Sequence, residues 1–352
     1  MLSTLLCVVL LWVGAPVSTT PAGDWTLRWA ENAKLPKAIR QFELPRPDGS
    51  TLTAFLGVFG ADAGVRKPLV ILCDGSGAQS LFAAVGDKVG MTGLLGQFGR
   101  SLAGEFHVVA LEKRGVKFLD GVRPGSAEGA SEEYQQHATL EDRVADVRLV
   151  IDALLKQAPV DPSRVIVIGH SEGSDVAAAV SAAEPRVTHA ACLAGAGITQ
   201  FFDLVILQRR GMLKEGLPEQ VIANQIEQLH AEFAKILAAP DAIDQFFMGH
   251  AYKRWASFAK TPPVESLRKS RCKLFLAHGS ADESVPVESF EALVAELVRS
   301  GRKDMTVRRY PDRDHGFMET GADRSKPAMQ DVLADILAWL GTPASQPAGA
   351  AR

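Results

Sequence analysis

Short runs of apolar and β-branched residues recur along the chain, and apolar residues with helical spacing lie between them. Most of these runs are continuous rather than alternating, which is typical of parallel strands covered on both faces. Helical periods stand out at Leu140 to Leu155 and at Ser289 to Val298. The alternation of strand and helix predicts a doubly wound, mostly parallel α/β sheet. Its predicted core strands are residues 68–73, 106–112, 164–169, 188–195, 273–279 and 305–310.

An antiparallel hairpin is predicted ahead of the parallel strands. The stretch "AIRQFELPRPDGSTLTAFLGVF" holds two extended runs on either side of Pro47-Asp48-Gly49. Proline and the Asp-Gly pair are typical of tight turns between paired strands. The sheet is therefore expected to begin with this N-terminal hairpin.

The segment 200–258 does not follow the alternation of strand and helix. It contains helical sequence such as "PEQVIANQIEQLHAEFAKILAA" and no convincing strand. We interpret it as a small helical cap inserted into a main domain at residues 37–340. The alternative is a crossover connection whose extra helices only pack against the main domain.

Residues 341–352 are rich in Pro, Ala and Gly, which predicts a disordered tail.

The chain starts with an apolar run, "LLCVVLLWVGAPVSTTPAG", that ends just before the first charged side chain, Asp24. The run is short for a membrane span but has the length of the hydrophobic region of a signal peptide. We therefore expect residues 1–18 to be a signal peptide and the protein to be exported, periplasmic or secreted. No Lys or Arg precedes the run, so an uncleaved N-terminal membrane anchor is the alternative.

Composition narrows the class of partner. With 352 residues, 47% of them apolar and 22% charged, the chain can bury a large core. A net charge of -3 and the absence of a long Lys/Arg cluster argue against nucleic-acid binding, so small molecules are expected as partners.

Beyond the leader, Cys73, Cys192 and Cys272 lie in apolar runs without metal-ligand spacing. They are expected to be buried thiols rather than a disulfide framework or a zinc site.

The stretch "RVIVIGHSEGSDVAAAV" changes from strand to helix at Ser171. Glycines at 169 and 173 would relieve the crowding of a sharp strand-to-helix turn, and the helix would point its positive N-terminal end at the serine. We expect Ser171 to have a strained backbone that exposes its hydroxyl above the sheet edge. This is the local setting of a serine nucleophile, whereas a plain tight turn is the alternative.

A serine hydroxyl needs a base and an orienting acid, and the last third of the chain offers both. The loop in "LFLAHGSADESVP" carries Asp282, with Glu283 as its neighbouring rival. The loop in "YPDRDHGF" carries His315. His170, beside the serine, and His278, at a strand end, are interpreted as structural histidines. Each chosen residue follows a predicted strand, where ligand sites of open α/β sheets lie.

These loops resemble those of the α/β-hydrolase superfamily. "GHSEG", "HGSADESVP" and "DHGF" are similar to the nucleophile elbow, acid loop and histidine loop of bacterial members near the serine aminopeptidase and dienelactone hydrolase-like groups. The resemblance covers roughly Ala38 to Leu340 in the order of elements and is specific at these loops. It implies the α/β-hydrolase fold and hydrolysis of an ester, amide or thioester through an acyl-enzyme.

The resemblance also implies an oxyanion hole made of two backbone N–H groups. One belongs to Glu172, after the serine, and we assign the other to Ser76 in "LVILCDGSGAQ". Many relatives have His before the first glycine of that loop, whereas this chain has Asp74. A carboxylate there would oppose the developing negative charge, so we expect it to point away or to pair with Lys113 or Arg114. The side chain of Glu172 is expected to be a solvated charge.

The sequence thus predicts a serine hydrolase in which His315 takes the proton of Ser171 and Asp282 orients the imidazole. Carboxylesterase is the first choice of activity, and a serine aminopeptidase acting on short peptides is the alternative. A catalytically silent ligand sensor with the same fold is a further alternative. No metal or organic cofactor is expected, and membrane contact is expected only if the N-terminal segment stays uncleaved.

Overall fold

The computed structural model describes residues 27–59, 64–121, 125–319, 321 and 329–341. The predicted signal peptide lies outside these residues, and so does the predicted tail apart from Gly341.

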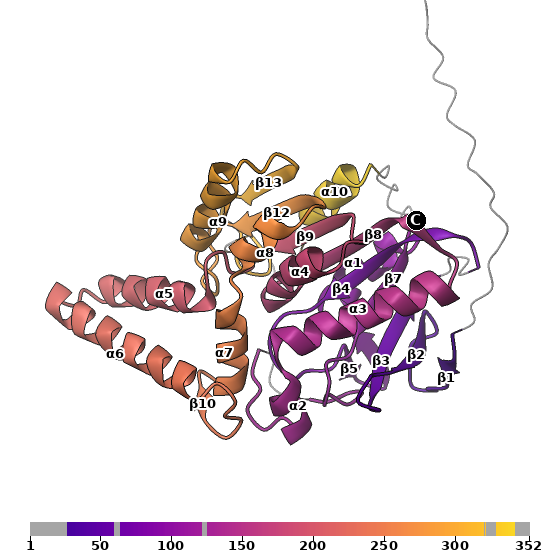
Figure 1. Cartoon of the computed structure of the whole chain (residues 1–352), viewed down its shortest axis with the longest axis horizontal. Helices are drawn as coiled ribbons and strands as arrows, with labels where there is room; N and C mark the ends of the chain where they lie inside the picture. Colours follow the sequence, from indigo (N-terminus) through magenta and orange to yellow (C-terminus); the bar gives the residue numbers. More distant parts are fainter. Residues whose placement is uncertain (1–26, 60–63, 122–124, 320, 322–328, 342–352) are drawn as a thin grey trace, which may run out of the picture.

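A central sheet organises the described part of the chain (Figure 1). Its strands run in the spatial order β1-β2-β3-β7-β4-β8-β9-β12-β13. From β7 to β13 every neighbouring pair is parallel, whereas β1, β2 and β3 pair antiparallel and β3 pairs antiparallel with β7. The predicted core strands are all present, as are the mostly parallel order and the N-terminal hairpin. The strands are β1 (Trp29–Ala30), β2 (Ile39–Pro45), β3 (Thr51–Gly57), β4 (Lys67–Cys73), β7 (His107–Leu111), β8 (Val160–His170), β9 (His189–Leu193), β12 (Lys273–Gly279) and β13 (Met305–Tyr310).

Helices cover both faces of this sheet, which explains the continuous apolar runs. In β4, Leu69 and Ile71 belong to one hydrophobic cluster, whereas Val70 and Leu72 belong to the other. The first cluster includes side chains of α3 (Leu140–Gln157), α4 (Glu172–Ala183), α8 (Pro263–Lys269) and α9 (Val287–Arg299). The second includes α1 (Gly93–Leu102) and α10 (Gln330–Trp339). The architecture is the doubly wound sheet that the sequence predicts.

The turn between β2 and β3 forms as its sequence suggests. Gly49 has φ 85°, a conformation that glycine adopts without steric cost. The Asp48 carboxylate accepts a hydrogen bond from Ser50 N at 2.9 Å, which closes the turn.

A second, smaller hairpin and two helices near it are not predicted by the sequence pattern. The hairpin consists of β5 (Phe82–Val85) and β6 (Lys88–Met91), and the helices are α1 and α2 (Glu132–His137). In the hairpin only Phe82 is buried, so its strands have no repeated apolar face for a pattern to reveal.

The insertion at residues 200–258 contains α5 (Gln200–Lys214), α6 (Glu219–Ala238) and most of α7 (Tyr252–Lys260). Figure 1 shows α5 and α6 extending away from the sheet. They have a small core of their own, in which the rings of Phe201 and Phe233 stack at 4.1 Å between centroids. The expectation of no strand here is wrong in one detail, because β10 (Phe246–Phe247) and β11 (His250–Ala251) form a short hairpin. None of the helices described is long and apolar enough to cross a membrane.

Candidate active site

Ser171 occupies the corner between β8, which ends at His170, and α4, which begins at Glu172. Its backbone has φ 57° and ψ -128°, a strained conformation for a residue with a side chain. The Ser171 N–H donates to Leu193 O at 2.9 Å, so the neighbouring strand β9 holds the corner in place. The strained turn expected from the sequence is therefore present.

The two glycines of this turn are required by contact distances. A Cβ at Gly169 would lie 1.9 Å from Gly173 O, and a Cβ at Gly173 would lie 1.9 Å from Cys73 O. Both distances are far inside van der Waals contact, so the elbow closes against β4 only because these positions lack side chains. The spacing of glycine, serine and glycine thus has a steric cause.

Asp282 and His315 are brought together by the loops after β12 and β13. His315 Nδ1 lies 2.8 Å from Asp282 Oδ2. Burial raises the pKa of Asp282, but the hydrogen bond and charge of His315 outweigh it and the pKa is lowered. An ionised carboxylate can only accept, so Nδ1 carries the proton and Nε2 is left as the basic nitrogen. Glu283, the rival acid, is exposed.

The two remaining histidines near the site have structural contacts. His170 Nε2 lies 2.8 Å from the carbonyl oxygen of His315, and burial lowers the pKa of His170 to about 4. A neutral His170 can donate to that carbonyl and support the histidine loop. His278 is buried, with its Nε2 3.0 Å from Val285 O and 3.4 Å from Asp282 Oδ2. Both residues therefore brace the loops that carry the acid and the histidine.

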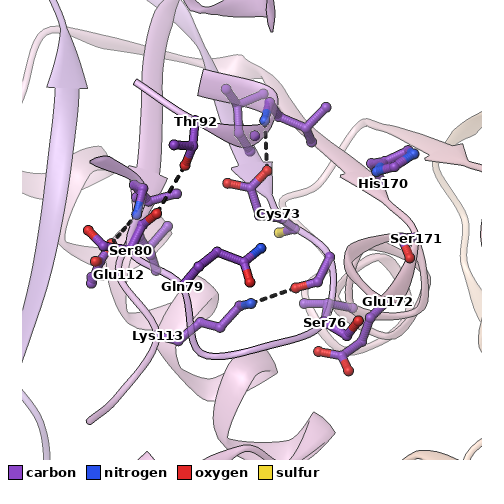
Figure 2. Close-up of a pocket in the computed structure, with 18 of the residues that line it drawn as sticks. Cys73, Ser76, Gln79, Ser80, Thr92, Glu112, Lys113, His170, Ser171 and Glu172 are labelled. Carbon is purple, nitrogen blue, oxygen red and sulfur yellow. Dashed lines mark hydrogen bonds between the residues drawn. The ribbon is translucent and has the colours of Figure 1, made fainter. Parts of the chain in front are cut away.

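A cavity of about 680 Å³ contains Ser171 and His315 in its lining, together with Ser76 and Glu172. Figure 2 shows Ser171 at one end of this pocket and Glu112 at the other. The insertion at residues 200–258 contributes no described residue to the lining. The predicted nucleophile, base and oxyanion donors thus line one cavity.

The loop after β4 lies against the serine. A Cβ at Gly75 would be 3.1 Å from Ser171 Cβ and 3.5 Å from Ser171 Oγ. Among the residues described, the backbone N–H groups of Gly75 and Ser76 have no hydrogen-bond partner. Glu172 is the first residue of α4, so its N–H has no partner within the helix. These free donors are available to an anion beside the serine.

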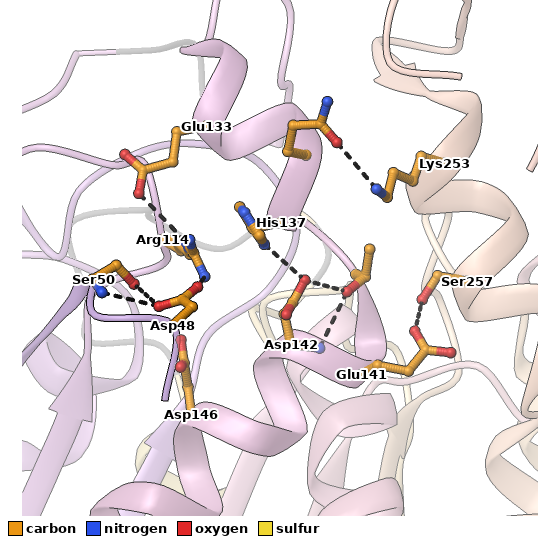
Figure 3. Close-up of polar contacts among 12 residues, drawn as sticks. Asp48, Ser50, Arg114, Glu133, His137, Glu141, Asp142, Asp146, Lys253 and Ser257 are labelled. Carbon is orange, nitrogen blue, oxygen red and sulfur yellow. Dashed lines mark hydrogen bonds and ion pairs between the residues drawn. The ribbon is translucent and has the colours of Figure 1, made fainter. Parts of the chain in front are cut away.

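Asp74 was expected to point away from the oxyanion or to pair with Lys113 or Arg114, and no such ion pair is found among the described residues. Asp74 Oδ1 instead accepts from Leu94 N at 2.7 Å and so caps the N-terminus of α1, whose own N-cap residue makes no side-chain cap. Arg114 pairs with Asp48 at 2.6 Å and with Glu133 at 3.4 Å (Figure 3). Burial raises the pKa of Asp74. The unusual acid of this loop is therefore used to cap a helix.

The expectation that the side chain of Glu172 is a solvated charge is also wrong. Glu172 is buried, with Oε1 2.5 Å from Arg143 Nη1 and Oε2 2.9 Å from Arg254 Nε. Burial alone would raise the pKa of Glu172, but the attraction of Arg254 and Arg143 outweighs it and lowers that pKa to about 2. The residue after the serine is thus an ionised, buried anchor. Sequence reasoning missed Arg143 and Arg254 because nothing local connects them with the elbow.

The cysteines Cys73, Cys192 and Cys272 are buried free thiols, as their apolar surroundings predict. Within the described ranges, no group of three or more His, Cys, Asp or Glu side chains is placed to hold a metal ion.

Comparison with protein families matches the prolyl oligopeptidase family to residues 240–344. The matched stretch contains β12, β13, Asp282 and His315, whereas Ser171 lies before it. A comparison of the sequence with curated proteins finds no match.

Solved structures with a similar fold include both peptidases and esterases. A puromycin-hydrolyzing peptidase from Mycobacterium tuberculosis has a TM-score of 0.54 and 17% identity, over 88% of this chain and 40% of that one. The acylaminoacyl peptidase from Pyrococcus horikoshii has a TM-score of 0.54 and 14% identity, over 89% of this chain and 43% of that one. An acetyl xylan esterase from Thermoanaerobacterium has a TM-score of 0.52 and 14% identity, over 90% of this chain and 89% of that one. The chain therefore spans less than half the length of these two peptidases.

At these identities the solved structures show a shared fold. The chain therefore has the α/β-hydrolase fold, and its residues 240–344 are similar to the prolyl oligopeptidase family.

Proposed function

We propose that the chain is a carboxylesterase-like enzyme that works through a Ser171, His315 and Asp282 triad. His315 Nε2 takes the proton from the Ser171 hydroxyl as its oxygen attacks the substrate carbonyl. Asp282 holds the imidazole in the tautomer that leaves Nε2 free. The backbone N–H groups of Ser76 and Glu172 bind the oxyanion. The imidazolium protonates the leaving group, and water then releases the acyl group by the reverse of these steps.

One arrangement carries this proposal. Asp282 and His315 are joined at 2.8 Å, and His315 lines the same cavity as a serine with a strained, positive-φ backbone. A structural turn does not require a buried, ionised acid and a histidine at the same cavity, whereas an acyl-transfer site does.

Fluorophosphonate labelling followed by peptide mapping tests the proposal. We expect a single labelled site at Ser171, with hydrolysis of short p-nitrophenyl esters by the same preparation. Label on a different serine would contradict the assignment of the nucleophile.

A serine aminopeptidase acting on short peptides is the second candidate. The match to the prolyl oligopeptidase family and the likeness to two peptidase structures favour it. A panel of aminoacyl anilides beside p-nitrophenyl esters separates the two, because the better substrate class has the higher kcat/KM. A protein that neither takes the label nor cleaves either class would instead be a catalytically silent ligand sensor.

We further propose that the protein is exported after cleavage near Ser18, on the basis of the apolar N-terminal run. Mass determination of the chain from the exported fraction tests this, and full-length chain in the membrane fraction would favour an N-terminal anchor.

A further inference from the structure

Two half-buried cations, Lys113 and Arg143, hold the loop that carries Ser76. Lys113 Nζ donates to Gly75 O at 2.5 Å and to Gly77 O at 2.6 Å. Arg143 Nη2 donates to Asp74 O at 2.6 Å. In Figure 2 the Lys113 side chain reaches toward this loop from the side opposite Ser171. Three carbonyls of the loop therefore accept hydrogen bonds from cations.

The orientation of each carbonyl also fixes the orientation of the N–H group in the same peptide. In a planar trans peptide the C=O and the N–H point in opposite directions. The Gly75 carbonyl and the Ser76 N–H belong to one peptide, so the Lys113 contact directs the Ser76 N–H away from Lys113. By the same geometry, the Arg143 contact with Asp74 O sets the direction of the Gly75 N–H.

Arg143 also connects this loop with the other side of the oxyanion hole. Its Nη1 lies 2.5 Å from Glu172 Oε1, while its Nη2 holds Asp74 O. One guanidinium group therefore spans the loop after β4 and the first residue of α4. The planar fork of arginine holds its N–H groups in a fixed geometry, which suits two acceptors at a fixed separation.

Hydrogen bonds hold the start of the helix that carries Arg143. Arg143 lies in the first turns of α3, a helix capped by Thr139 Oγ1, which accepts from Asp142 N at 3.1 Å. Ser257 of α7 accepts from Leu140 N at 2.8 Å, so the insertion also fixes this end of α3. Arg254 of α7 completes the arrangement by holding the second oxygen of Glu172.

We propose that Lys113 and Arg143 are positioning residues that aim the oxyanion donors at the carbonyl held by Ser171. The inference rests on the proposed function. Without these contacts the loop carbonyls could rotate toward the site, where their negative ends would oppose an oxyanion. Both residues also line the cavity. In this proposal they act through the backbone of residues 74–77 and through Glu172, not by direct contact with the substrate carbonyl.

The test uses Lys113→Met and Arg143→Lys. Both keep most of the side-chain volume, and the second keeps the positive charge. Two control variants remove similar contacts elsewhere. Lys67 Nζ donates to Ala103 O at 3.2 Å at the other end of β4, and Arg302 donates to the carbonyl oxygens of Ser270 and Cys272. The controls are Lys67→Met and Arg302→Lys.

We expect kcat for the best p-nitrophenyl ester to fall about 10- to 100-fold in both site variants, which is somewhat less than the loss of one oxyanion donor costs. KM should change by less than about threefold, because these contacts matter mainly in the transition state. The inhibition constant of a trifluoromethyl ketone, which forms a tetrahedral adduct with serine, should rise by the same factor as kcat falls. The controls should keep wild-type kcat.

Wild-type kcat and an unchanged inhibition constant in folded Arg143→Lys would overturn the inference, even if Lys113→Met does not fold. Equal losses of kcat in the site variants and the controls would also overturn it, because they would reflect general destabilisation. A wild-type protein that takes no fluorophosphonate label and cleaves no substrate would contradict the proposed function itself, and this inference with it.

Discussion

His315 Nδ1 lies 2.8 Å from Asp282 Oδ2, although the two residues follow different strands of the sheet. β12 and β13 are parallel neighbours, with Gly279 opposite Tyr310 at their carboxyl ends. The loops that leave these ends start side by side, so the short contact between acid and histidine follows from the strand pairing. The same edge of the sheet carries Ser171 at the end of β8.

The substitution Ser171→Ala should abolish fluorophosphonate labelling and hydrolysis while leaving the fold intact, because the hydroxyl supplies chemistry and little packing. The control is Ser163→Ala, an exposed serine on the same strand. Circular dichroism and thermal unfolding check the fold. Undiminished hydrolysis by Ser171→Ala would show that another residue is the nucleophile.

Asp282→Asn should lower kcat by orders of magnitude, roughly 10⁴-fold in the best-studied triad. An asparagine amide can donate to Nδ1, which would place the imidazole proton on Nε2 and block its role as base. Glu283→Gln is the matched control, since its side chain is exposed. Steady-state kinetics of both variants measure kcat and show which of the two carboxylates the reaction needs. If Glu283→Gln lost most of its kcat and Asp282→Asn lost little, Glu283 would be the acid of the triad instead of Asp282.

Gly75→Ala should reduce kcat/KM without unfolding the protein. Its new methyl group would lie 3.1 Å from Ser171 Cβ, so the serine must shift by a few tenths of an ångström. We expect a loss of roughly tenfold, short of the 10²-fold that a 1 Å misplacement can cost. Gly104→Ala is the control because a Cβ there meets no atom within 4 Å. Equal kcat/KM in the two variants would argue against close contact between the loop and the nucleophile.

Asp203 should make the protein less stable as pH rises. It is buried at the start of α5, its Oδ1 has no partner among the described residues, and burial raises its pKa to about 8. Between the unfolded pKa near 4 and the folded pKa near 8, the folded state binds a proton that the unfolded state has lost. The free energy of unfolding should therefore fall across this window, by at most about 1.4 kcal/mol per pH unit from this group.

The variant Asp203→Asn should remove this contribution. The free energy of unfolding of the variant minus that of the wild type should be larger at pH 8 than at pH 5. Urea denaturation at both pH values measures this difference. Asp244→Asn, at an exposed position of the insertion, serves as the control. A change that is the same at both pH values would mean that Asp203 does not bind the extra proton.

The strands, their mostly parallel arrangement and the elbow at Ser171 could be predicted from the sequence because their causes are local. Buried parallel strands require continuous apolar runs, and the contacts at 1.9 Å explain why Gly169 and Gly173 flank the serine. The loop positions of Asp282 and His315 followed from the same strands. The hairpin β5–β6 escaped prediction because its strands have no repeated apolar face.

Only the tertiary structure decided the partners of the charged groups, because those partners lie far away along the chain. Glu172 is separated by 29 residues from Arg143 and by 82 from Arg254, while Asp74 caps α1 through the N–H of Leu94, 20 residues later. The sequence favoured a solvated Glu172 and an Asp74 that points away or pairs with Lys113 or Arg114. Packing instead places Glu172 between two arginines and gives Asp74 a backbone N–H as donor, since a buried carboxylate must find donors wherever the fold brings them. The sequence by itself determined which residues stand at the carboxyl edge of the sheet, and the fold determined how they are held.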